Sequence, residues 1–446
     1  MELLTKKVLV IGMARSGIAA AKLLKTLGAN VILNDSKAIN DIEGLPPGEY
    51  IYKTGVNPDG LIDGCDLIVI SPSVPPGLPA LQEARRRGIE VLTEIELGYR
   101  LCKGQTVAIS GTNGKTTTTT LTGRIFSDAN RSNFVVGNIG VPYSAHALEA
   151  QPRDIMVTEI SSYQLECIDT FHPHVAAMLN ITPDHLNRHG DMNGYIAAKK
   201  RLFRNQTHKD FAVLNYDDET VRSMAEDIDA RVLFFSYEKE LGEGIFIEDG
   251  IITFCLGALK QPICKCSEVN IKGRHNIENA MAAAAIGMLM GVSAANVAQT
   301  LMSFEGVEHR IETVRTLNDI TFINDSKGTN PDSTIKAIQT MTKPTVLILG
   351  GYDKGGEFDG LIKEYTDNIR HTVVLGETSQ KIIAALERAG IKEYTCAGSF
   401  EEGVRLAGEA ARPGWNVLLS PACASFDMFA DFEERGRVFK ELVNSL

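Results

Sequence analysis

The chain has 446 residues, of which 44% are hydrophobic, and its formal net charge at pH 7 is −11. This length is enough for two to four domains, each with its own core, and the composition is that of a globular protein. The acidic excess argues against a nucleic acid or an anionic membrane as a partner.

Cysteine usage and hydropathy exclude further classes of protein. The eight cysteines are scattered and no secretory leader opens the chain, so we expect reduced thiols in a cytoplasmic protein. Cys264-x-Cys266, with Cys255 nearby, could suggest a metal site. No fourth ligand lies at metal-site spacing, which favours plain thiols over a zinc site. No apolar stretch reaches the roughly 18 residues of a membrane helix, and the longest, 280–290, is interpreted as a buried helix. The Arg85–Arg87 cluster is interpreted as a solvated helix face.

The chain opens with the pattern of a dinucleotide-type βαβ unit. The expected elements are a strand, a helix and a strand, at 8–11, 18–27 and 31–33. The loop over 12–17 has the form G-x-A-x-x-G, and Asp35 follows about 20 positions later. Ala14 replaces the second glycine and leaves less room for a pyrophosphate, so these residues leave NAD binding open.

A second polar loop lies at the same edge of this expected sheet. The strand at 67–70 runs into Ser71 and a proline-rich loop, and the unit closes near residue 93. Ligands of such folds collect at the carboxyl ends of the strands. The N-terminal segment is therefore predicted to bind a nucleotide-linked substrate.

The most informative stretch is Ser-Gly-Thr-Asn-Gly-Lys-Thr-Thr, residues 110–117, which lies between an apolar strand and a Thr-rich helical run. Its glycines let backbone N–H groups turn inward, and the helix start adds its positive dipole end. Lys115 would reach the β and γ phosphates of a nucleotide, and the Thr116 hydroxyl would hold Mg²⁺. Only two residues separate the glycines, where the common P-loop has four. The alternative is an ordinary glycine turn before a helix.

Polar residues follow the next expected strands of the central region. Strands are expected at 134–136, 155–158, 175–179 and 211–215. Alternation of strands with helices implies a parallel sheet, whose carboxyl ends would bring Asn138, Glu159 and His185 close to the phosphate loop. The Glu159 carboxylate suits Mg²⁺, whereas His185 reads equally well as a hydrogen-bonded core histidine. Lys199, in a helix expected at 195–203, reads from the residues alone as part of a solvated basic face.

The period changes after these strands. Short antiparallel strands are expected at 232–235, 245–247 and 251–254, with Glu248-Asp249-Gly250 as a hairpin turn. A polar stretch over 272–276 is expected to precede a long helix at 277–290, which contains Asn279. Such a stretch can bind a nucleotide or merely cap the helix.

The last third reads as a second Rossmann-like sheet that begins near residue 304. Its strands are expected at 320–323, 345–349, 372–375 and 417–419. The loops that carry Lys327 and Lys354 could hold an anionic acceptor. Three α/β units with one triphosphate cradle favour an ATP-driven ligase over a simple ATPase.

Motifs in all three units resemble the Mur ligases of peptidoglycan synthesis, in order and over essentially the whole chain. The general motifs of the family lie at 112–117, 159–166 and 274–276. Two loops, 324–330 and 420–427, resemble the branch of the family that adds D-glutamate. Gly328 stands where that family more usually has alanine.

This resemblance implies an α/β fold of three domains. They are a Rossmann-like UDP-substrate domain over 1–93, a central P-loop-type ATPase domain over 94–303, and a C-terminal Rossmann-like amino-acid domain over 304–446. The central domain is expected to combine a parallel sheet with a small antiparallel sheet. The implied reaction uses ATP and Mg²⁺ to join D-glutamate to UDP-N-acetylmuramoyl-L-alanine through an acyl phosphate, in the cytoplasm. A monomer is expected.

The resemblance also implies the site residues. Those for the UDP-linked substrate are Arg15, Ser16, Asp35, Ser36, Ser71, Asn138 and His185. Those for ATP are Gly111, Thr112, Asn113, Gly114, Lys115, Thr116, Thr117, Asn279, Arg310 and Asp325. Those for D-glutamate are Lys327, Thr329, Lys354, Ser425, Phe426 and Phe432. The expected metal ligands are Thr116 and Glu159 for one Mg²⁺, and His185 and a carbamylated Lys199 for a second. This assignment reverses the reading of Lys199 from the residues alone.

Three alternatives remain at this level. A sister ligase would add L-alanine or a diamino acid, or would extend folate with glutamate, and would differ in the third unit. An NAD-dependent oxidoreductase would use Gly12 and Asp35 but would leave Lys115, Glu159 and His185 without a role. A nucleotide-gated binding module would bind ATP without forming an amide.

Overall fold

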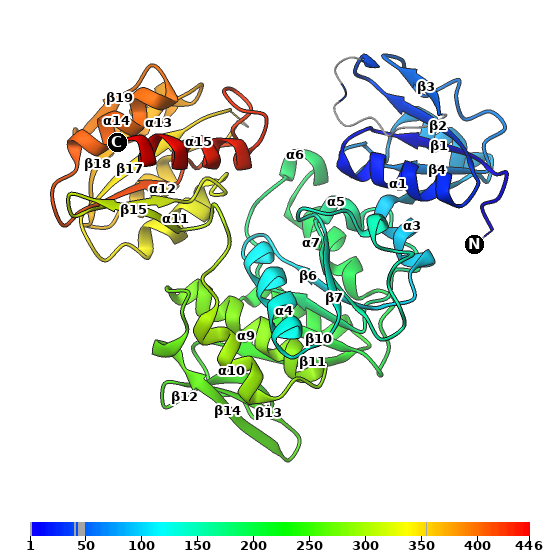
Figure 1. The fold of residues 1–446 in the computed structure, drawn as a ribbon, viewed down its shortest axis with the longest axis horizontal. Helices are drawn as coiled ribbons and strands as arrows, with labels where there is room; N and C mark the ends of the chain where they lie inside the picture. The colour runs from blue at the N-terminus through cyan, green and yellow to red at the C-terminus, as the bar shows by residue number, and fades with distance from the viewer. Residues whose placement is uncertain (1, 40–41, 43–49, 354) are drawn as a thin grey trace. The chain divides into compact units, whose positions relative to one another are not determined.

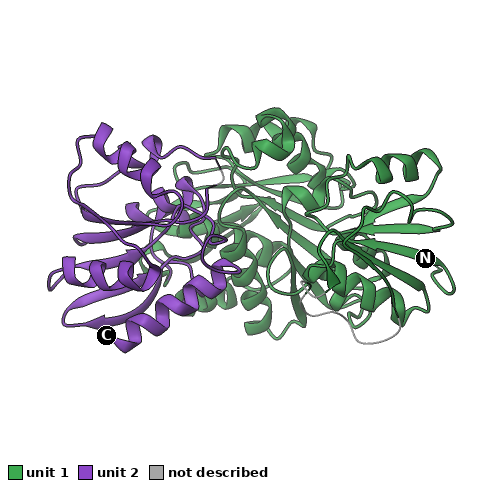
Figure 2. Cartoon of the chain, turned by 90° about the horizontal axis from the view of Figure 1, so that it is seen from above, with its two compact units in different colours: residues 1–270, 276–304 green, residues 271–275, 305–446 purple. Residues whose placement is uncertain are grey.

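The computed structural model describes residues 2–39, 42, 50–353 and 355–446. They form three sheets, coloured along the chain in Figure 1. Two compact units result, one of residues 1–270 with 276–304 and one of residues 271–275 with 305–446 (Figure 2). The first two sheets belong to unit 1 and the third to unit 2. The expected three-part α/β architecture is confirmed.

The first sheet is fully parallel, with the order β3-β2-β1-β4-β5. Its strands are β1 Lys7–Ile11, β2 Asn30–Asp35, β3 Ile51–Thr54, β4 Leu67–Ile70 and β5 Glu90–Thr93. Alternate residues of β1 enter different cores, because side chains along a strand point to opposite faces. Val8 and Val10 pack with α1 (Arg15–Thr26) and α3 (Glu94–Leu101), and Leu9 packs with α2 (Pro79–Arg86). The edge strand β3 was not expected, since its Ile-Tyr-Lys-Thr sequence is half-exposed.

The central sheet has nine strands in the order β14-β13-β12-β11-β10-β9-β6-β8-β7. They are β6 Gln105–Ser110, β7 Asn133–Gly137, β8 Ile155–Glu159, β9 Val175–Met178, β10 Phe211–Asn215, β11 Arg231–Ser236, β12 Gly244–Glu248, β13 Ile251–Leu256 and β14 Leu259–Lys265. The turn at Asp249-Gly250 is confirmed, with φ of 51° and 78°, the left-handed backbone of a tight hairpin.

One expectation for this region was wrong. Strand β11 is parallel to both β10 and β12. It runs parallel to β10 because the crossover between them contains α8 (Glu219–Ser223) and is long enough to return the chain. Only β12, β13 and β14 are antiparallel, and they extend the large sheet rather than form a separate one.

Helices cover the central sheet on both faces. The chief ones are α4 Lys115–Asp128, α5 Ser162–Leu165, α6 Leu186–His189, α7 Met192–Lys200, α9 Arg274–Leu289 and α10 Ala294–Ser303. Leu165 of α5 and Tyr195 of α7 join one core with Ala108, Met156 and Ala176 of the strands. Helix α9 begins earlier than expected, so Arg274-His275-Asn276 forms its first turn and not a preceding loop.

The third sheet has the order β15-β16-β20-β17-β18-β19. Its strands are β15 Glu312–Leu317, β16 Ile320–Asn324, β17 Thr345–Gly350, β18 Ile369–Leu375, β19 Tyr394–Cys396 and β20 Asn416–Leu419. One face packs on α11 Pro331–Gln339, α12 Asp359–Lys363 and α13 Ser379–Arg388, and the other on α14 Phe400–Ala410 and α15 Phe432–Ser445. The second Rossmann-like sheet is thus confirmed. Strands β15 and β19 were not expected, and β15 is antiparallel to β16.

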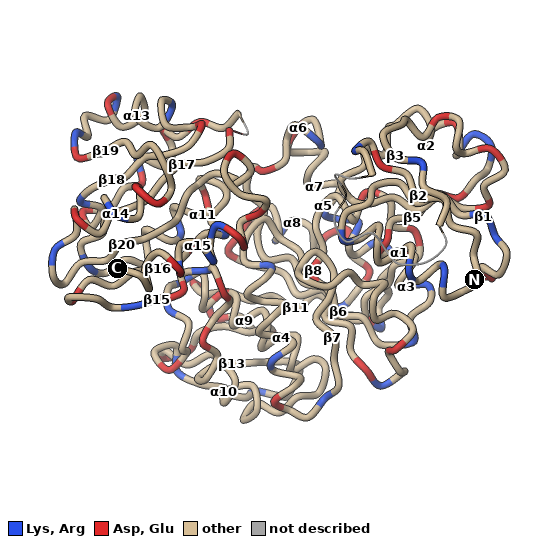
Figure 3. Tube along the Cα trace, turned by 45° about the horizontal axis from the view of Figure 1, so that its top comes forward, with Lys and Arg blue, Asp and Glu red and all other residues tan. Residues whose placement is uncertain are grey.

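Charged residues of both signs are interspersed along the trace (Figure 3). In the cluster on α2, Arg86 and Arg87 both bind Glu83, whereas Arg85 donates to the carbonyl of Pro76 at 2.7 Å. Two of these three arginines thus form ion pairs on their own helix. Across the residues described, no helix has the length and apolar character to cross a membrane.

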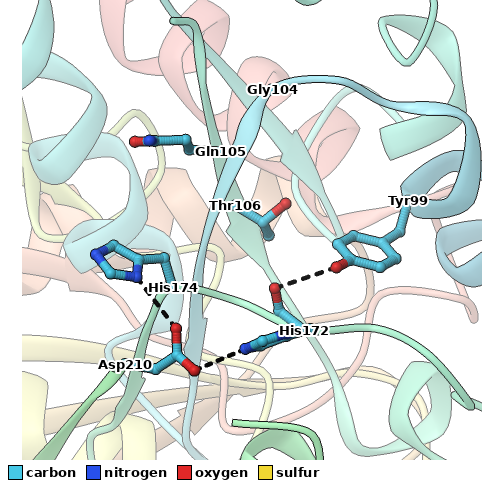
Figure 4. Close-up of a pocket in the computed structure, with 7 residues that line it drawn as sticks. All are labelled: Tyr99, Gly104, Gln105, Thr106, His172, His174 and Asp210. Atoms are coloured by element: carbon cyan, nitrogen blue, oxygen red, sulfur yellow. Dashed lines mark hydrogen bonds and ion pairs between the residues drawn. The ribbon is translucent and has the colours of Figure 1, made fainter. Parts of the chain in front are cut away.

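A pocket of about 260 Å³ lies at the amino edge of the central sheet (Figure 4). It is lined by Tyr99, Gly104, Gln105, Thr106, His172, His174 and Asp210. Asp210 lies between the two imidazoles, 2.7 Å from Nε2 of His172 and 3.1 Å from Nδ1 of His174. Strand β6 begins at this pocket and ends at the phosphate loop, so the two features lie at opposite edges of the sheet.

Asp210 makes unit 1 sensitive to acid. Burial alone would raise the pKa of Asp210, but hydrogen bonds from His172, Thr207 and His174 outweigh it and lower the pKa to about 2. A depressed carboxyl pKa stabilises the fold above the unfolded value of about 3.9, and this contribution is lost as the pH falls toward 2. We expect Asp210→Asn to lower the free energy of unfolding at pH 7 by about 1–3 kcal/mol. The deficit should shrink below pH 4 in urea titrations followed by circular dichroism.

The matched control is Asp59→Asn, because Asp59 is exposed. It should change stability at pH 7 by no more than about 0.5 kcal/mol. A deficit for Asp210→Asn that is as large at pH 3 as at pH 7 would contradict the assigned charge.

Candidate active site

The phosphate loop joins β6 to α4 and depends on two glycines with positive φ. Gly111 has φ 153°, and Gly114, the N-cap of α4, has φ 83°. A Cβ on Gly114 would lie 2.2 Å from Oδ1 of Asn279. Gly114 is therefore required both for its backbone conformation and for the close approach of α9, which brings the expected Asn279 to the loop.

Two lysine amines converge on one carbonyl of this loop. Lys115 Nζ donates to the oxygens of Gly111 and Thr112 at 2.9 and 2.7 Å, and Lys199 Nζ donates to the same Gly111 oxygen at 2.7 Å. Lys199 is only 1% exposed. Burial, and then the charge of Lys115, hold the pKa of Lys199 well below its ordinary value. The solvated basic face read from the residues alone is wrong for Lys199, whereas Lys200 pairs with Asp227 at the surface.

Residues after β9 hold the loop in place. Asn180 accepts from the N–H of Asn113 at 2.8 Å and donates to the Asn113 carbonyl at 3.1 Å. The Thr112 hydroxyl donates to the carbonyl of Thr182 at 3.1 Å and lies 3.1 Å from the Tyr195 hydroxyl. The sequence did not identify Asn180 or Tyr195 as supports of the loop. The only signal was a polar side chain directly after a buried strand.

Asn138 and Glu159 meet at the carboxyl end of the central sheet, as expected from the topology. Glu159 ends β8 and is paired in register with Ile109 of β6, one residue before the phosphate loop begins. Its carboxylate is 1% exposed and accepts from Asn138 Nδ2 at 2.8 Å. A buried carboxylate beside a phosphate loop is a suitable oxygen ligand for Mg²⁺.

His185 occupies a strained position between two polar neighbours. Its φ is 54°, unusual for a residue with a side chain, and it is the N-cap of α6. Nδ1 lies 3.0 Å from the Tyr163 hydroxyl, and Nε2 lies 3.5 Å from Oδ2 of Asp184. Tyr163 lies in the motif at 159–166, but the sequence assigned it no role. Its hydroxyl fixes the orientation of the imidazole.

The first glycine loop is held by the residues expected to line it. A Cβ on Gly12 would lie 2.8 Å from the Cβ of Ser71, so this glycine permits the two loops to touch. Both oxygens of Asp35 accept main-chain N–H groups, from Met13 at 2.6 Å and Lys37 at 2.9 Å. In an NAD site this carboxylate would bind a ribose, whereas here Asp35 stabilises the glycine loop and the turn that follows β2.

The remaining residues expected around the UDP-linked substrate lie beside these. Arg15 and Ser16 open α1, and Ser36 is exposed directly after Asp35. Arg188 on α6 joins the loop after β4 to the end of α5. Its Nη2 donates to the Val74 carbonyl at 3.1 Å and to the carboxylate of Glu166 at 2.6 Å.

In unit 2, polar loops follow the strands β16, β17 and β20. Asp325, directly after β16, accepts from the Ser420 hydroxyl at 2.7 Å. Burial raises the pKa of Asp325 to about 6, although the charge of Arg310 opposes the rise. A Cβ at Gly328 would lie 2.6 Å from Oδ2 of Asp325. The glycine that replaces the family's alanine therefore makes room for this carboxyl group.

The residues expected to hold D-glutamate are partly assembled within unit 2. Lys327 Nζ lies 4.7 Å from the centre of the Phe432 ring. The N–H of Thr329 donates to the Lys327 carbonyl at 2.8 Å, Ser425 is buried, and Phe426 is 63% exposed. Lys354 lies outside the described residues.

The donor set fits a magnesium ion that is also held by a nucleotide. Thr116, in the first turn of α4, and Glu159 are buried oxygen donors beside the phosphate loop. No group of three or more His, Cys, Asp or Glu side chains within the described ranges is arranged to hold a metal. Mg²⁺ typically takes one or two protein oxygens and completes its shell with phosphate and water, which matches this set.

Family models match three consecutive parts of the chain. They are a Mur ligase MurD-like N-terminal domain over residues 6–93, a Mur ligase middle domain over 109–287, and a Mur ligase glutamate ligase domain over 309–423. Together they cover more than half of the sequence, in the order of its three sheets.

Curated relatives match along the whole length. A UDP-N-acetylmuramoylalanine--D-glutamate ligase of Alkaliphilus metalliredigens is 45% identical and covers 100% of this chain and 99% of its own. The protein of the same name from Clostridioides difficile is 44% identical, with 100% of both chains covered.

Solved structures share the fold at much lower identity. The UDP-N-acetylmuramate-alanine ligase MurC of Thermotoga maritima has a TM-score of 0.62 at 20% identity and covers 99% of both chains. The MurF ligase of the same organism, solved in complex with ADP, has a TM-score of 0.60 at 14% identity and covers 100% of this chain and 99% of its own. With three matched domain models and relatives at this identity over the full length, the chain belongs to the Mur ligase family.

Proposed function

We propose that this protein is the ATP-dependent ligase that joins D-glutamate to UDP-N-acetylmuramoyl-L-alanine, in the cytoplasmic synthesis of peptidoglycan precursors. The observation that carries the proposal is full-length identity of 44–46% to relatives named for this reaction. The phosphate loop with its two convergent lysines supports the ATP-dependent step.

Each part of the chain has a role in this proposal. Residues 1–93 bind the UDP-linked substrate, 94–303 bind ATP, and 304–446 bind the amino acid. The UDP-sugar contacts are Arg15, Ser16, Asp35, Ser36, Ser71, Asn138 and His185. The ATP contacts are Gly111 to Thr117, Asn279, Arg310 and Asp325. The D-glutamate contacts are Lys327, Thr329, Lys354, Ser425, Phe426 and Phe432.

Two magnesium sites complete the proposal. Thr116 and Glu159 would hold one ion, and His185 with a carbamylated Lys199 would hold the other. Mg²⁺, when bound, neutralises charge on the phosphate oxygens. The low pKa of Lys199 supports the modification, because an uncharged amine can add to CO₂ and lose a proton to give a carbamate anion.

The proposed reaction has two transfers. The terminal carboxylate of the alanine attacks the γ phosphorus of ATP, so that ADP leaves and an acyl phosphate forms. The Lys115 ammonium group stabilises the charge on the transferring oxygens. The D-glutamate nitrogen then attacks the acyl carbon, loses a proton and expels phosphate. Exclusion of water protects the acyl phosphate until this step.

An amino-acid panel tests the acceptor. Purified protein is given ATP, Mg²⁺, UDP-N-acetylmuramoyl-L-alanine and one of D-glutamate, L-alanine, meso-diaminopimelate or L-glutamate, and the amide product is measured by mass spectrometry. We expect product with D-glutamate and release of one ADP for each amide. Preference for another amino acid would indicate a sister ligase, and ATP binding without an amide would indicate a binding module.

The control in this assay is Lys115→Ala. Removing the ammonium group should lower the ADP release that depends on the UDP-sugar by roughly 100-fold or more. Undiminished turnover would show that residues 110–117 are not the triphosphate site.

The carbamate has its own test. Burial lowers the pKa of Lys199 and so favours the neutral amine, and ¹³C-labelled bicarbonate should therefore give a carbamate signal in the wild-type NMR spectrum. Lys199→Met should lack this signal and lose activity by roughly 100-fold. The control is Lys200→Met, which removes a surface lysine and should keep both. An identical signal in Lys199→Met would refute the assignment.

A further inference from the structure

Unit 2 contains a buried cation that the proposed chemistry does not use. Arg435 lies in the second turn of α15 and is 1% exposed. Nε donates to the Ser326 hydroxyl at 3.0 Å and Nη2 to the Ser326 carbonyl at 2.7 Å. Nη1 donates to the carbonyls of Cys423 and Ala424 at 3.1 and 3.2 Å. All three guanidinium nitrogens are therefore satisfied, and by main-chain or hydroxyl oxygens.

These acceptors lie in loops that follow adjacent strands. Ser326 follows β16, and Cys423 and Ala424 follow β20, its neighbour in the sheet. The loop after β17, the next strand, also reaches this point, since a Cβ on Gly351 would lie 3.3 Å from Nη1 of Arg435. The N–H of Tyr352 donates to the Ala424 carbonyl at 2.9 Å. The guanidinium group thus joins the loops after β16 and β20 directly, and the loop after β17 is joined to them through the Ala424 carbonyl.

The charge of Arg435 is retained in this buried position. Burial lowers the pKa of Arg435 to about 10, which still leaves the group protonated at neutral pH. Burying a cation without a carboxylate in direct contact is costly. The hydrogen bonds to neutral oxygens hold the group in place. The carboxylates of Asp427 and Asp325 act on its charge without accepting a hydrogen bond from it, so its positive potential also reaches a substrate bound at the loops.

The residues next to these acceptors are those proposed to bind the amino acid. Lys327 follows Ser326 in the chain, and Ser425 and Phe426 follow Ala424. Phe432 lies one turn before Arg435 on α15, and its carbonyl accepts from the Ser326 hydroxyl at 2.8 Å. Displacement of any of the three loops would therefore move groups that would contact the substrate.

We propose that Arg435 is a positioning residue for the amino-acid substrate. It holds the loops after β16, β17 and β20 in one arrangement, and its buried charge favours an acidic side chain over a neutral one of the same shape. This inference rests on the proposed function, because it takes D-glutamate as the substrate bound at these loops.

The test compares substrates in the full-length protein. Arg435→Gln removes the charge and the planar fork, so the KM for D-glutamate should rise by about 10-fold or more. The KM for the UDP-sugar should stay unchanged, because none of its proposed contacts lies in these loops. The ratio of kcat/KM for D-glutamate over that for D-glutamine should fall. Arg435→Lys restores the charge but not the fork, so it should keep the preference for the acid while the KM for D-glutamate remains raised.

The control is Arg437→Gln, an exposed arginine of the same helix, which should leave all these values unchanged. If Arg435→Gln does not fold, Arg435→Lys decides the question, and a wild-type KM for D-glutamate in that variant overturns the inference. A lower melting temperature with unchanged KM and acid preference also overturns it, because the role would then be purely structural. Wild-type turnover is measured first, so failure of the proposed function appears there and not only in the variants.

Discussion

The carbonyl oxygen of Gly111 accepts from two lysine amines, and the arrangement of the central site depends on this contact. It requires the left-handed turn of the loop, the approach of α9 over Gly114, and the burial of α7 beneath the sheet edge. Two ammonium groups that share one acceptor repel each other, and this repulsion disfavours the charged form of the more buried group. Burial, and then the charge of Lys115, lower the pKa of Lys199, which makes this lysine chemically different from a lysine exposed to solvent.

In all three sheets, polar residues lie together at the carboxyl ends of the parallel strands. Parallel strands end together, so residues far apart in sequence meet without any long loop to join them. The glycine loop after β1 meets Asp35 on one side and Ser71 on the other at the first sheet. Asn138 meets Glu159 at the second sheet, and Asp325 meets Ser420 at the third. This is why the strand order expected from the sequence was enough to predict that Asn138 and Glu159 lie together.

Recognition of the strands from sequence succeeded where apolar runs were buried on both faces, as in β1, β6 and β17. It failed for β3, β14, β15 and β19, whose residues are mostly half-exposed or exposed, and for the direction of β11. A short apolar strand has the same hydrophobic pattern whether it pairs in parallel or antiparallel. The direction of pairing depends on the connection between the strands.

The burial of Lys199 and Arg435 could not be derived from composition. Both are basic residues in helices rich in charge, and such a pattern usually indicates a solvated face. Their burial is set by tertiary packing against Gly111 and Ser326, which are distant in sequence. For Lys199, the resemblance to a family pointed to a place in the site that the local pattern did not indicate. For Arg435, only the contacts in the folded structure show that it is buried.

The nine-stranded sheet leaves β14 as an edge strand, which has a consequence for association. An open edge with free N–H and C=O groups is a template for a strand of another chain. β14 carries Pro262 in its middle, where no N–H can be donated, and ends at Lys265, whose charge disfavours a second identical edge, whereas Lys260 is paired with Glu248. This edge of the largest sheet is therefore a poor template for a strand of a second copy of the chain.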